Sequence, residues 1–233
     1  MTIELHDSLD GQVALVTGAT RGIGAEIAAG LVDLGATVYA GARDTADITA
    51  PDQRAVALDV TDETEIREAV SRIRDETGRL DIAVNNAGVY PESGPIHEMD
   101  TADLDRTLTV NLRGPALVAK HVIPLVTERE GGRIINLSSG LGRFTDGQMG
   151  GSSPPYRLSK VGLGGLTAYL DAEYAADGLL ANAVSPGWVR TDMGGSSARR
   201  SPEKGAETPV WLSRFQPSCP SGQLWKDQER ITW

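Results

Sequence analysis

The sequence predicts an α/β fold in which one doubly wound, parallel β-sheet is flanked by helices on both faces. Short apolar runs without alternation, which are typical of strands buried on both faces, recur along the chain. Stretches with apolar residues at helical spacing separate these runs. No repeat or linker interrupts the alternation, so residues 1–233 are expected to form a single domain.

The composition argues against several classes of protein. The formal charge of −10 disfavours binding to nucleic acid or to an anionic membrane, because both require a basic surface. Cys219 is the only cysteine, so no internal disulfide is expected and nothing indicates an oxidising compartment. The N-terminus lacks the apolar run of a signal peptide, and no run is long enough to span a bilayer. A soluble cytoplasmic protein is therefore expected.

The first two predicted strands and the helix between them form a βαβ unit. Residues 13–16 are the first strand and residues 37–40 are the second. The helix between them has apolar side chains at helical spacing, and Gly35 stands where it is expected to end. Parallel strands need such a crossover, so this unit begins a parallel sheet.

A glycine-rich turn from Thr17 to Gly24 joins the first strand to this helix. Gly18 permits the tight turn, Gly22 lets the backbone approach a phosphate group, and Gly24 lets the helix pack closely on the strand. The helix N-terminus offers unpaired N–H groups and the positive end of a dipole to a pyrophosphate. Such a turn can be purely structural, but the flanking strand and helix favour a nucleotide site.

The end of the second strand bears on which nucleotide binds. Sites for NAD usually carry an acidic residue roughly 20 residues past the glycines, where it binds the ribose 2′-hydroxyl. Here the first charged side chain is that of Arg43, which suits a 2′-phosphate, and Arg21 in the glycine turn adds a second cation. Both arginines can instead be solvated, and Asp44 can still serve a hydroxyl. The pattern favours NADP(H) over NAD(H).

Four further strands are expected to end at the same edge of the sheet as the glycine turn. Each is given with the residues that follow it: 55–58 before Asp59 and Val60, 80–84 before Asn85 to Gly88, 133–137 before Ser138 to Gly140, and 180–184 before Ser185 to Thr191. Ligands of open α/β sheets bind at this edge, so these residues are expected near a cofactor.

Asp62 and Glu65 predict a capping box at the helix that follows residues 55–58. A further helix is predicted from about Pro202, with Ser201 as its cap, and residues 223–225 form a last possible strand.

A long helix is predicted near residues 101–130, with Asn111 followed four residues later by Pro115. Proline has no N–H to donate to the Asn111 carbonyl, so the helix should bend or fray there. One interpretation is a routine proline kink, and the functional alternative is a carbonyl held open to bind a water molecule.

Tyr156 and Lys160 lie four residues apart on a predicted helix that starts near Pro155, so they share one face. A phenol alone holds its proton to about pH 10. A neighbouring ammonium favours the phenolate and lowers its pKa toward the range of acid–base catalysis. The same pattern is common on surface helices, so it gains weight only from the motifs that precede it.

In this order the motifs resemble those of the short-chain dehydrogenase/reductase family, specifically its shorter, single-domain members with a Rossmann-type fold. The matching residues are Thr17-Gly18-x-x-x-Gly22-x-Gly24, Asp59, Asn86-Ala87-Gly88, Asn111, Ser139, Tyr156-x-x-x-Lys160, Pro186-Gly187 and Thr191. They cover nearly the whole chain. Ser138-Ser139-Gly140 and Arg43-Asp44 look most like the carbonyl-reductase-type members that use NADPH. The resemblance implies an NADP(H)-dependent enzyme that acts on a ketone, an aldehyde or a secondary alcohol.

The resemblance also implies a role for each matching residue. Ser139 would hold the substrate carbonyl oxygen, and Tyr156 would exchange a proton with that oxygen. Lys160 would bind the nicotinamide ribose and lower the pKa of Tyr156, while Asn111 would hold a water through its main-chain carbonyl. The implied cofactor site comprises Gly18, Thr20, Arg21, Gly22, Ile23, Gly24, Arg43, Asp59, Val60, Asn86, Ala87, Gly88, Tyr156, Lys160, Pro186, Gly187, Val189 and Thr191. Within it, Asp59 would meet the adenine, and Val189 and Thr191 the nicotinamide amide.

The substrate pocket departs from the family pattern. Ser139 lies 17 residues before Tyr156, further than in many members, and the extra residues fall in the loop 140–155. The large apolar side chains expected to line the pocket are Tyr90, Phe144, Met149, Trp188 and Met193. Residues 192–200 are a candidate for a small polar lid.

Residues 1–135 would form the cofactor half and residues 136–233 the catalytic half. A homodimer or homotetramer is implied, through the helices that carry Asn111 and Tyr156.

Two other functions compete with this interpretation. One is a nucleotide-binding regulator that retained the fold and lost turnover, although such a protein has no need of Tyr156. The other is a hydrolase, which the lack of a G-x-S-x-G motif disfavours. The histidines, His6, His97 and His121, show neither triad nor metal-ligand spacing, and no metal site is expected.

Overall fold

A computed structural model describes residues 3–91, 93–145 and 149–233. In these residues one sheet has the strand order β3-β2-β1-β4-β5-β6-β7-β8, with the β7–β8 pair antiparallel and the other pairs parallel. The strands are β1 (Val13–Thr17), β2 (Thr37–Ala42), β3 (Arg54–Ala57), β4 (Ile82–Asn85), β5 (Arg133–Leu137), β6 (Leu180–Val184), β7 (Leu224–Lys226) and β8 (Glu229–Ile231). The helices are α1 (Gly22–Asp33), α2 (Glu63–Thr77), α3 (Thr101–Leu108), α4 (Gly114–Val126), α5 (Pro154–Tyr174) and α6 (Pro202–Leu212).

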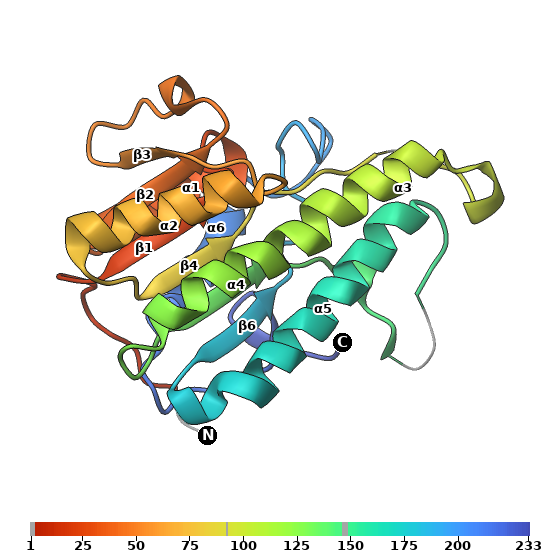
Figure 1. Cartoon of the computed structure of the whole chain (residues 1–233). Helices are drawn as coiled ribbons and strands as arrows, with labels where there is room; N and C mark the ends of the chain where they lie inside the picture. Colours follow the sequence, from red (N-terminus) through yellow and green to blue (C-terminus); the bar gives the residue numbers. More distant parts are fainter. Residues whose placement is uncertain (1–2, 92, 146–148) are drawn as a thin grey trace.

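The helices form two layers that sandwich the sheet (Figure 1). Helices α1 and α6 cover one face, where Ile27 and Leu212 pack on sheet residues such as Val16. Helices α2, α4 and α5 cover the other face, where Val122 packs with residues such as Leu15. Successive residues of β1 thus point into opposite cores, which is why its sequence is apolar without alternation. The doubly wound α/β prediction is confirmed, and no described helix has the length and apolar character needed to cross a membrane.

The C-terminal hairpin contains a strand that the sequence analysis missed. Strand β7 lies where a last strand was predicted, but β8 follows it after a tight turn at Asp227 and Gln228. Both turn residues have positive φ angles, +53° and +62°. Hairpin turns of this kind usually contain asparagine or glycine, so Asp-Gln carried no recognisable signal.

The helix predicted over residues 101–130 is interrupted and shorter than expected. Between α3 and α4 lies a π-helical turn, η3 (Thr109–Arg113), and α4 ends at Val126. Gly114 N–H bonds the carbonyl of Thr109, five residues back, just before the proline at 115. The predicted distortion at Asn111 is therefore confirmed, because Pro115 cannot donate the bond that regular helix geometry requires.

Half of the predicted capping box on α2 is present. The Asp62 carboxylate accepts a hydrogen bond from Thr64 N–H at 2.8 Å. The N–H of Asp62, however, donates to the carbonyl of Asp59 at 3.0 Å, so it is not available to Glu65. The Glu65 carboxylate instead accepts the N–H of Asp59 at 2.7 Å, so that part of the prediction is wrong. The cap predicted for α6 is confirmed, since Ser201 Oγ accepts from Lys204 N–H.

Candidate active site

The glycine turn brings bare backbone to the N-terminus of α1. Gly18 has φ +65°, and a Cβ there would lie 3.0 Å from Ala87 Cα. A Cβ on Gly24 would lie 2.2 Å from the Gly18 carbonyl oxygen. Arg21, the N-cap of α1, is extended and its side chain makes no capping hydrogen bond. The first-turn N–H groups, beside glycines 18 and 24 where no Cβ can be accommodated, fit a phosphate-bearing cofactor.

Asn86 supports this turn from the end of β4. Its Nδ2 donates to the carbonyls of Thr17 and Gly18, both at 2.9 Å. In return, Thr17 Oγ1 accepts hydrogen bonds from the N–H groups of Asn86 at 3.0 Å and Ala87 at 3.1 Å. The side-chain amide of Asn86 therefore holds the turn in shape, which leaves backbone rather than side chain for any cofactor contact.

Asn111 connects the segment after β4 to the helix that carries Tyr156. Its side chain is fully buried in η3. Oδ1 accepts from Val89 N–H at 2.8 Å, and Nδ2 donates to Val89 O at 2.9 Å and to Ser159 Oγ at 3.2 Å. Ser159 Oγ in turn donates to the carbonyl of Tyr156 at 2.7 Å. The sequence pointed only to the main-chain carbonyl of Asn111. It missed Ser159, for which the helical spacing from Tyr156 was the available signal.

Tyr156 is buried at the start of α5, with 8% of its surface exposed. The ring of Tyr90 meets it edge-on, with centroids 4.7 Å apart, and the Tyr90 hydroxyl lies 2.8 Å from that of Ser153. Burial raises the pKa of Tyr156 to about 12, while the nearby Ser139 hydroxyl lowers it by less and Tyr90 raises it further. The lowered pKa expected from the sequence is wrong for this structure, because desolvation outweighs the favourable contacts.

Lys160 lies one turn beyond Tyr156, on the same face as predicted. Its Nζ donates to the Leu137 carbonyl at 2.6 Å and lies 5.4 Å from the centre of the Tyr156 ring. Burial lowers the pKa of Lys160 to about 8. Gly142 permits this packing, since a Cβ there would lie 2.6 Å from Lys160 Cβ. The ammonium is thus held between the end of β5 and the phenol.

Ser139 is placed beside Tyr156 by a short helical turn, η4 (Gly140–Gly142). Its hydroxyl accepts from Leu141 N–H at 3.1 Å, and Gly140 N–H donates to Ser185 Oγ at 2.9 Å. Ser138 is buried at 4% exposure, and its N–H bonds the Val184 carbonyl in the sheet. The geometry therefore favours Ser139 over Ser138 as the hydroxyl that faces Tyr156.

The segment after β6 packs against the start of α1. Val189 is buried, and a Cβ on Gly205 would lie 3.0 Å from Val189 Cγ2 and 3.2 Å from Ile23 Cγ1. Thr191 lies beside Gly22, whose φ is +57° and whose added Cβ would be 2.9 Å from Thr191 Cγ2. The predicted nicotinamide contacts are therefore brought to the glycine turn.

The residues predicted on the adenine side of the cofactor follow strands β2 and β3. Asp59 Oδ1 accepts from both Thr61 N–H and Thr61 Oγ1 at 2.8 Å, and Val60 packs on Gly114. Arg43 is exposed at the end of β2. Asp44, next to it, uses Oδ1 to cap Ala46 N–H at 2.9 Å.

Three of the five predicted pocket residues form an exposed apolar rim on the loops after β5 and β6. Phe144, Trp188 and Met193 are 49%, 55% and 45% exposed. Met193 reaches toward the site, since its Cε would lie 3.9 Å from a Cβ added to Gly88. Met149 lines a cavity of about 360 Å³ next to η4, together with Gly140, Arg143, Thr145 and Gly150. Residues 146–148 of the predicted substrate loop lie outside the described residues.

Arg157 organises the described part of this loop, a role that the sequence did not suggest. Its Nη1 donates to the carbonyls of Met149 at 2.5 Å and Leu141 at 3.3 Å, and its Nε donates to that of Ser152 at 2.8 Å. One guanidinium can bind several carbonyls because its donors are fixed in a planar fork. Tyr156 is therefore followed directly by the residue that holds the loop.

Comparison with known proteins gives matches over most of the chain. A family model described as short chain dehydrogenase matches residues 12–202. The uncharacterized oxidoreductase YxbG of Bacillus subtilis (strain 168) is 33% identical over 237 residues, covering 96% of this chain and 83% of that protein. Cis-4-hydroxycyclohexanecarboxylate dehydrogenase of Sinomonas cyclohexanicum is 38% identical over 190 residues, covering 78% and 75%. The solved structure of a short chain dehydrogenase from Burkholderia cenocepacia J2315 in complex with NADP is 29% identical, with a TM-score of 0.82 and coverage of 94% and 96%.

The burial of Lys160 predicts a pH-dependent stability. Lys160→Met is expected to raise the free energy of unfolding at pH 7 by about 1–3 kcal/mol, because the folded state then no longer buries a charge. The folded pKa of about 8 lies below the ordinary 10.5, so the wild type regains stability as pH rises through this interval. The advantage of the variant should therefore shrink between pH 7 and pH 10, as measured by urea unfolding without cofactor. Lys226→Met, at an exposed position, is the control. A difference that stays constant with pH would contradict the assignment.

Proposed function

The chain belongs to the short-chain dehydrogenase family, and from this we propose that it is an NADP(H)-dependent oxidoreductase that interconverts a carbonyl group and a secondary alcohol. One observation carries the proposal. A buried phenol, Tyr156, has the Ser139 hydroxyl near enough to lower its pKa and lies one helical turn from the ammonium of Lys160. The Asn111 amide links Ser159, on the same helix as Tyr156, to Val89 in the segment after β4. In that same segment, Asn86 supports the glycine turn.

The residues of the chain can perform the proton chemistry of the reaction. The bound cofactor would supply or accept the hydride. Ser139 donates a hydrogen bond to the substrate oxygen, and Tyr156 donates its proton to that oxygen as the alcohol forms. A pKa near 12 keeps the phenol protonated at neutral pH, which is the form that reduction needs. Lys160, whose pKa of about 8 leaves it largely charged at pH 7, stabilises the phenolate that results.

The residues proposed to bind the cofactor come from two parts of the chain. Residues 1–135 carry the glycine turn and α1, whose N-terminus would hold the pyrophosphate. Residues 136–233 carry the acid–base group and the segment from Pro186 to Thr191, which would meet the nicotinamide. This segment lies against Gly22 and Ile23. The two parts are therefore close enough for one dinucleotide to bind to both.

Three features support NADP(H) as the cofactor. Arg43 is exposed where a 2′-phosphate would lie, and the Asp44 carboxylate beside it is engaged by Ala46 N–H. Arg21 pairs with Asp192 at 2.9 Å, but both side chains are 76% exposed, and ion pairs of this kind are weak enough to yield to a phosphate. The solved relative from Burkholderia cenocepacia is in complex with NADP.

The exposed apolar rim supports an apolar ketone or aldehyde as the substrate. Trp188 and Met193 lie on the loop after β6, and Phe144 lies on the loop after β5, so they flank the carboxyl edge of the sheet. Large apolar side chains that are exposed beside a site usually bind an apolar ligand surface. The relative from Sinomonas cyclohexanicum is named for the dehydrogenation of cis-4-hydroxycyclohexanecarboxylate, a ring alcohol that also carries a carboxylate.

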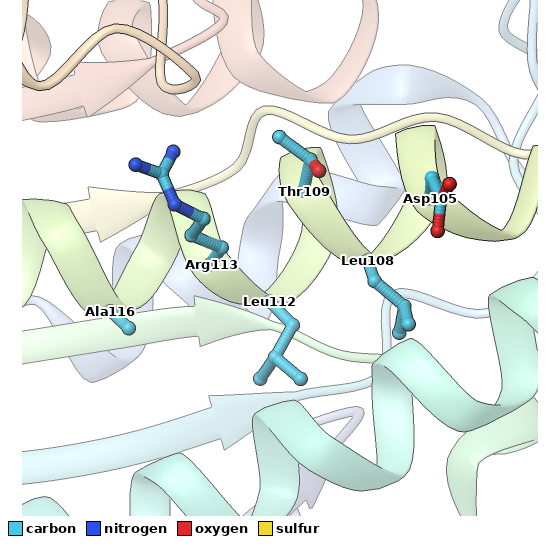
Figure 2. A pocket seen from close by; sticks show the side chains of 6 residues that line it. All are labelled: Asp105, Leu108, Thr109, Leu112, Arg113 and Ala116. Atoms are coloured by element: carbon cyan, nitrogen blue, oxygen red, sulfur yellow. The ribbon is translucent and has the colours of Figure 1, made fainter. Parts of the chain in front are cut away.

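A shallow groove along α3, η3 and the start of α4 supports assembly with a second copy of the chain (Figure 2). It has a volume of about 360 Å³ and is lined by Asp105, Leu108, Thr109, Leu112, Arg113 and Ala116. Figure 2 shows Leu108 and Leu112 pointing toward α5. On α5 the exposed Leu158 and Tyr169 share a helical face with Gly162, which contacts Leu112. Because this apolar surface adjoins the groove, two copies can bury it through these helices as a homodimer or half of a homotetramer.

Tyr156→Phe tests the chemistry. We expect turnover of NADPH with a panel of apolar ketones and aldehydes to fall by roughly 10²–10⁴-fold, because the proton donor is removed. NADPH binding, followed by fluorescence, should persist. Tyr174→Phe, which removes a hydroxyl further along α5, is the control and should keep full activity. A wild type that binds NADPH tightly but reduces nothing would instead indicate a regulatory nucleotide-binding protein.

Arg43→Ala tests the cofactor preference. The KM for NADPH is expected to rise by about tenfold or more, while that for NADH should change little, because only NADPH carries the 2′-phosphate. Steady-state kinetics with both nucleotides provide the measurement. Arg67→Ala, an exposed arginine on α2, is the control. Equal changes for both cofactors would remove Arg43 from the phosphate site.

Light scattering tests the assembly. The wild type is expected to be a dimer or tetramer at micromolar concentration, and Leu158→Lys combined with Tyr169→Lys should shift it toward monomer by placing charges in the apolar interface. Ile96→Lys changes an equally exposed apolar residue elsewhere on the surface and should leave the mass unchanged. A monomeric wild type would refute the proposed interface.

A further inference from the structure

The loop that follows β6 is closed at its base by Arg200. Arg190 N–H donates to Arg200 O at 2.8 Å, and Arg200 N–H donates to Trp188 O at 3.1 Å. Val189 and Arg200 accordingly form an isolated parallel bridge. The chain thus leaves the sheet after β6 and returns to the same point before α6 begins.

The side chain of Arg200 joins this base to the C-terminal hairpin. Its Nη1 and Nη2 donate to the two carboxylate oxygens of Asp227 at 2.5 Å and 2.7 Å, and Nη1 also donates to Pro186 O at 3.3 Å. Pairing with Arg200 lowers the pKa of Asp227. A two-pronged pair of this kind defines orientation as well as distance. It therefore links the start of the loop, its end and the β7–β8 turn.

Asp227 is itself held in place. It occupies the turn between β7 and β8 with φ +53°, and the next residue, Gln228, donates its N–H to Thr208 Oγ1 at 3.3 Å. Asp227 is thus fixed to both the sheet edge and α6. The guanidinium that it holds lies directly over Gly187, where φ is +82° and an added Cβ would be 2.7 Å from Arg200 Nε. Glycine at 187 is the residue that allows this contact.

We propose that the Arg200–Asp227 ion pair is a positioning clamp that sets the segment Pro186–Thr191 against the nicotinamide end of the cofactor. The inference rests on the proposed function. Neither member touches the reacting atoms, since each acts through the backbone of the loop. Pro186 is bonded by the guanidinium, Gly187 lies beneath it, and Val189 is bridged by the Arg200 backbone. The glycine turn has its own support from Asn86, so the clamp acts on one end of the cofactor only.

This difference between the two ends of the cofactor provides the test. In Asp227→Asn one of the two acceptor oxygens becomes an NH2 group, which cannot accept the second guanidinium N–H. We expect the Kd for NADPH to rise by about tenfold. The Kd for 2′,5′-ADP, which has the adenine and 2′-phosphate but no nicotinamide, should not change. Both are measured by titration calorimetry on the full chain, together with the melting temperature. NADH and ADP serve as the parallel pair.

Two further variants make the result specific. Arg200→Lys keeps the charge but loses the two-pronged geometry, so it should reproduce the selective loss of NADPH affinity even where Asp227→Asn folds poorly. Glu207→Gln makes the same carboxylate-to-amide change near Arg200, in an exposed pair with Lys204, and should leave both ligands unaffected.

The outcomes separate the inference from the proposed function. Weaker NADPH binding with unchanged 2′,5′-ADP binding supports the clamp. No change for either ligand, or an equal loss for both with a lower melting temperature, overturns it and leaves the pair a general stabiliser of the fold. A wild type that binds none of the four nucleotides would overturn the proposed function, and the inference with it.

Discussion

The hydrogen bonds of the Asn111 side chain are the interaction on which the site depends most. This one amide satisfies both backbone groups of Val89 and reaches Ser159 on α5. It can do so because η3 widens the helix at this point and turns a fully buried amide toward two other elements. Without it, the N–H and the carbonyl of Val89 would lose these partners, and the segment after β4 would lose its link through Ser159 to the helix that carries Tyr156.

The second constraint is the cost of burying Tyr156 and Lys160, the groups proposed to perform the proton chemistry. Desolvation raises the pKa of Tyr156 and lowers that of Lys160, so each is driven toward its neutral form. Part of this cost is offset for Lys160, because its Nζ donates a hydrogen bond to the Leu137 carbonyl. A protein that buries such groups at its active site is commonly less stable than the same protein would be with apolar residues there. The surrounding core, with Leu163 and Leu170 on the same helix, offsets that loss.

The sequence predicted the sheet well because its strands are apolar on both faces, and β5 and β6 have the predicted bounds. It predicted the close packing at Gly18 and Gly24 and the shared helical face of Tyr156 and Lys160, because their spacing reflects local backbone geometry. It could not predict the direction of the Tyr156 pKa, since desolvation depends on Tyr90 and on loops that are distant in sequence. For the same reason it missed Arg157, whose partners are backbone carbonyls that carry no residue-type signal.

The region around the predicted substrate pocket depends on the C-terminal hairpin. Arg143, just after η4, donates to the carbonyl and hydroxyl of Thr232, both at 2.8 Å. The ring of Trp233 covers Gly164 on α5, where an added Cβ would lie 2.8 Å away. The loop after β5 and the loop after β6 are thus both attached to the chain beyond β7, one through Arg143 and the other through Arg200. The carboxyl edge of the parallel sheet carries the groups proposed to react, and the antiparallel hairpin positions the loops around them.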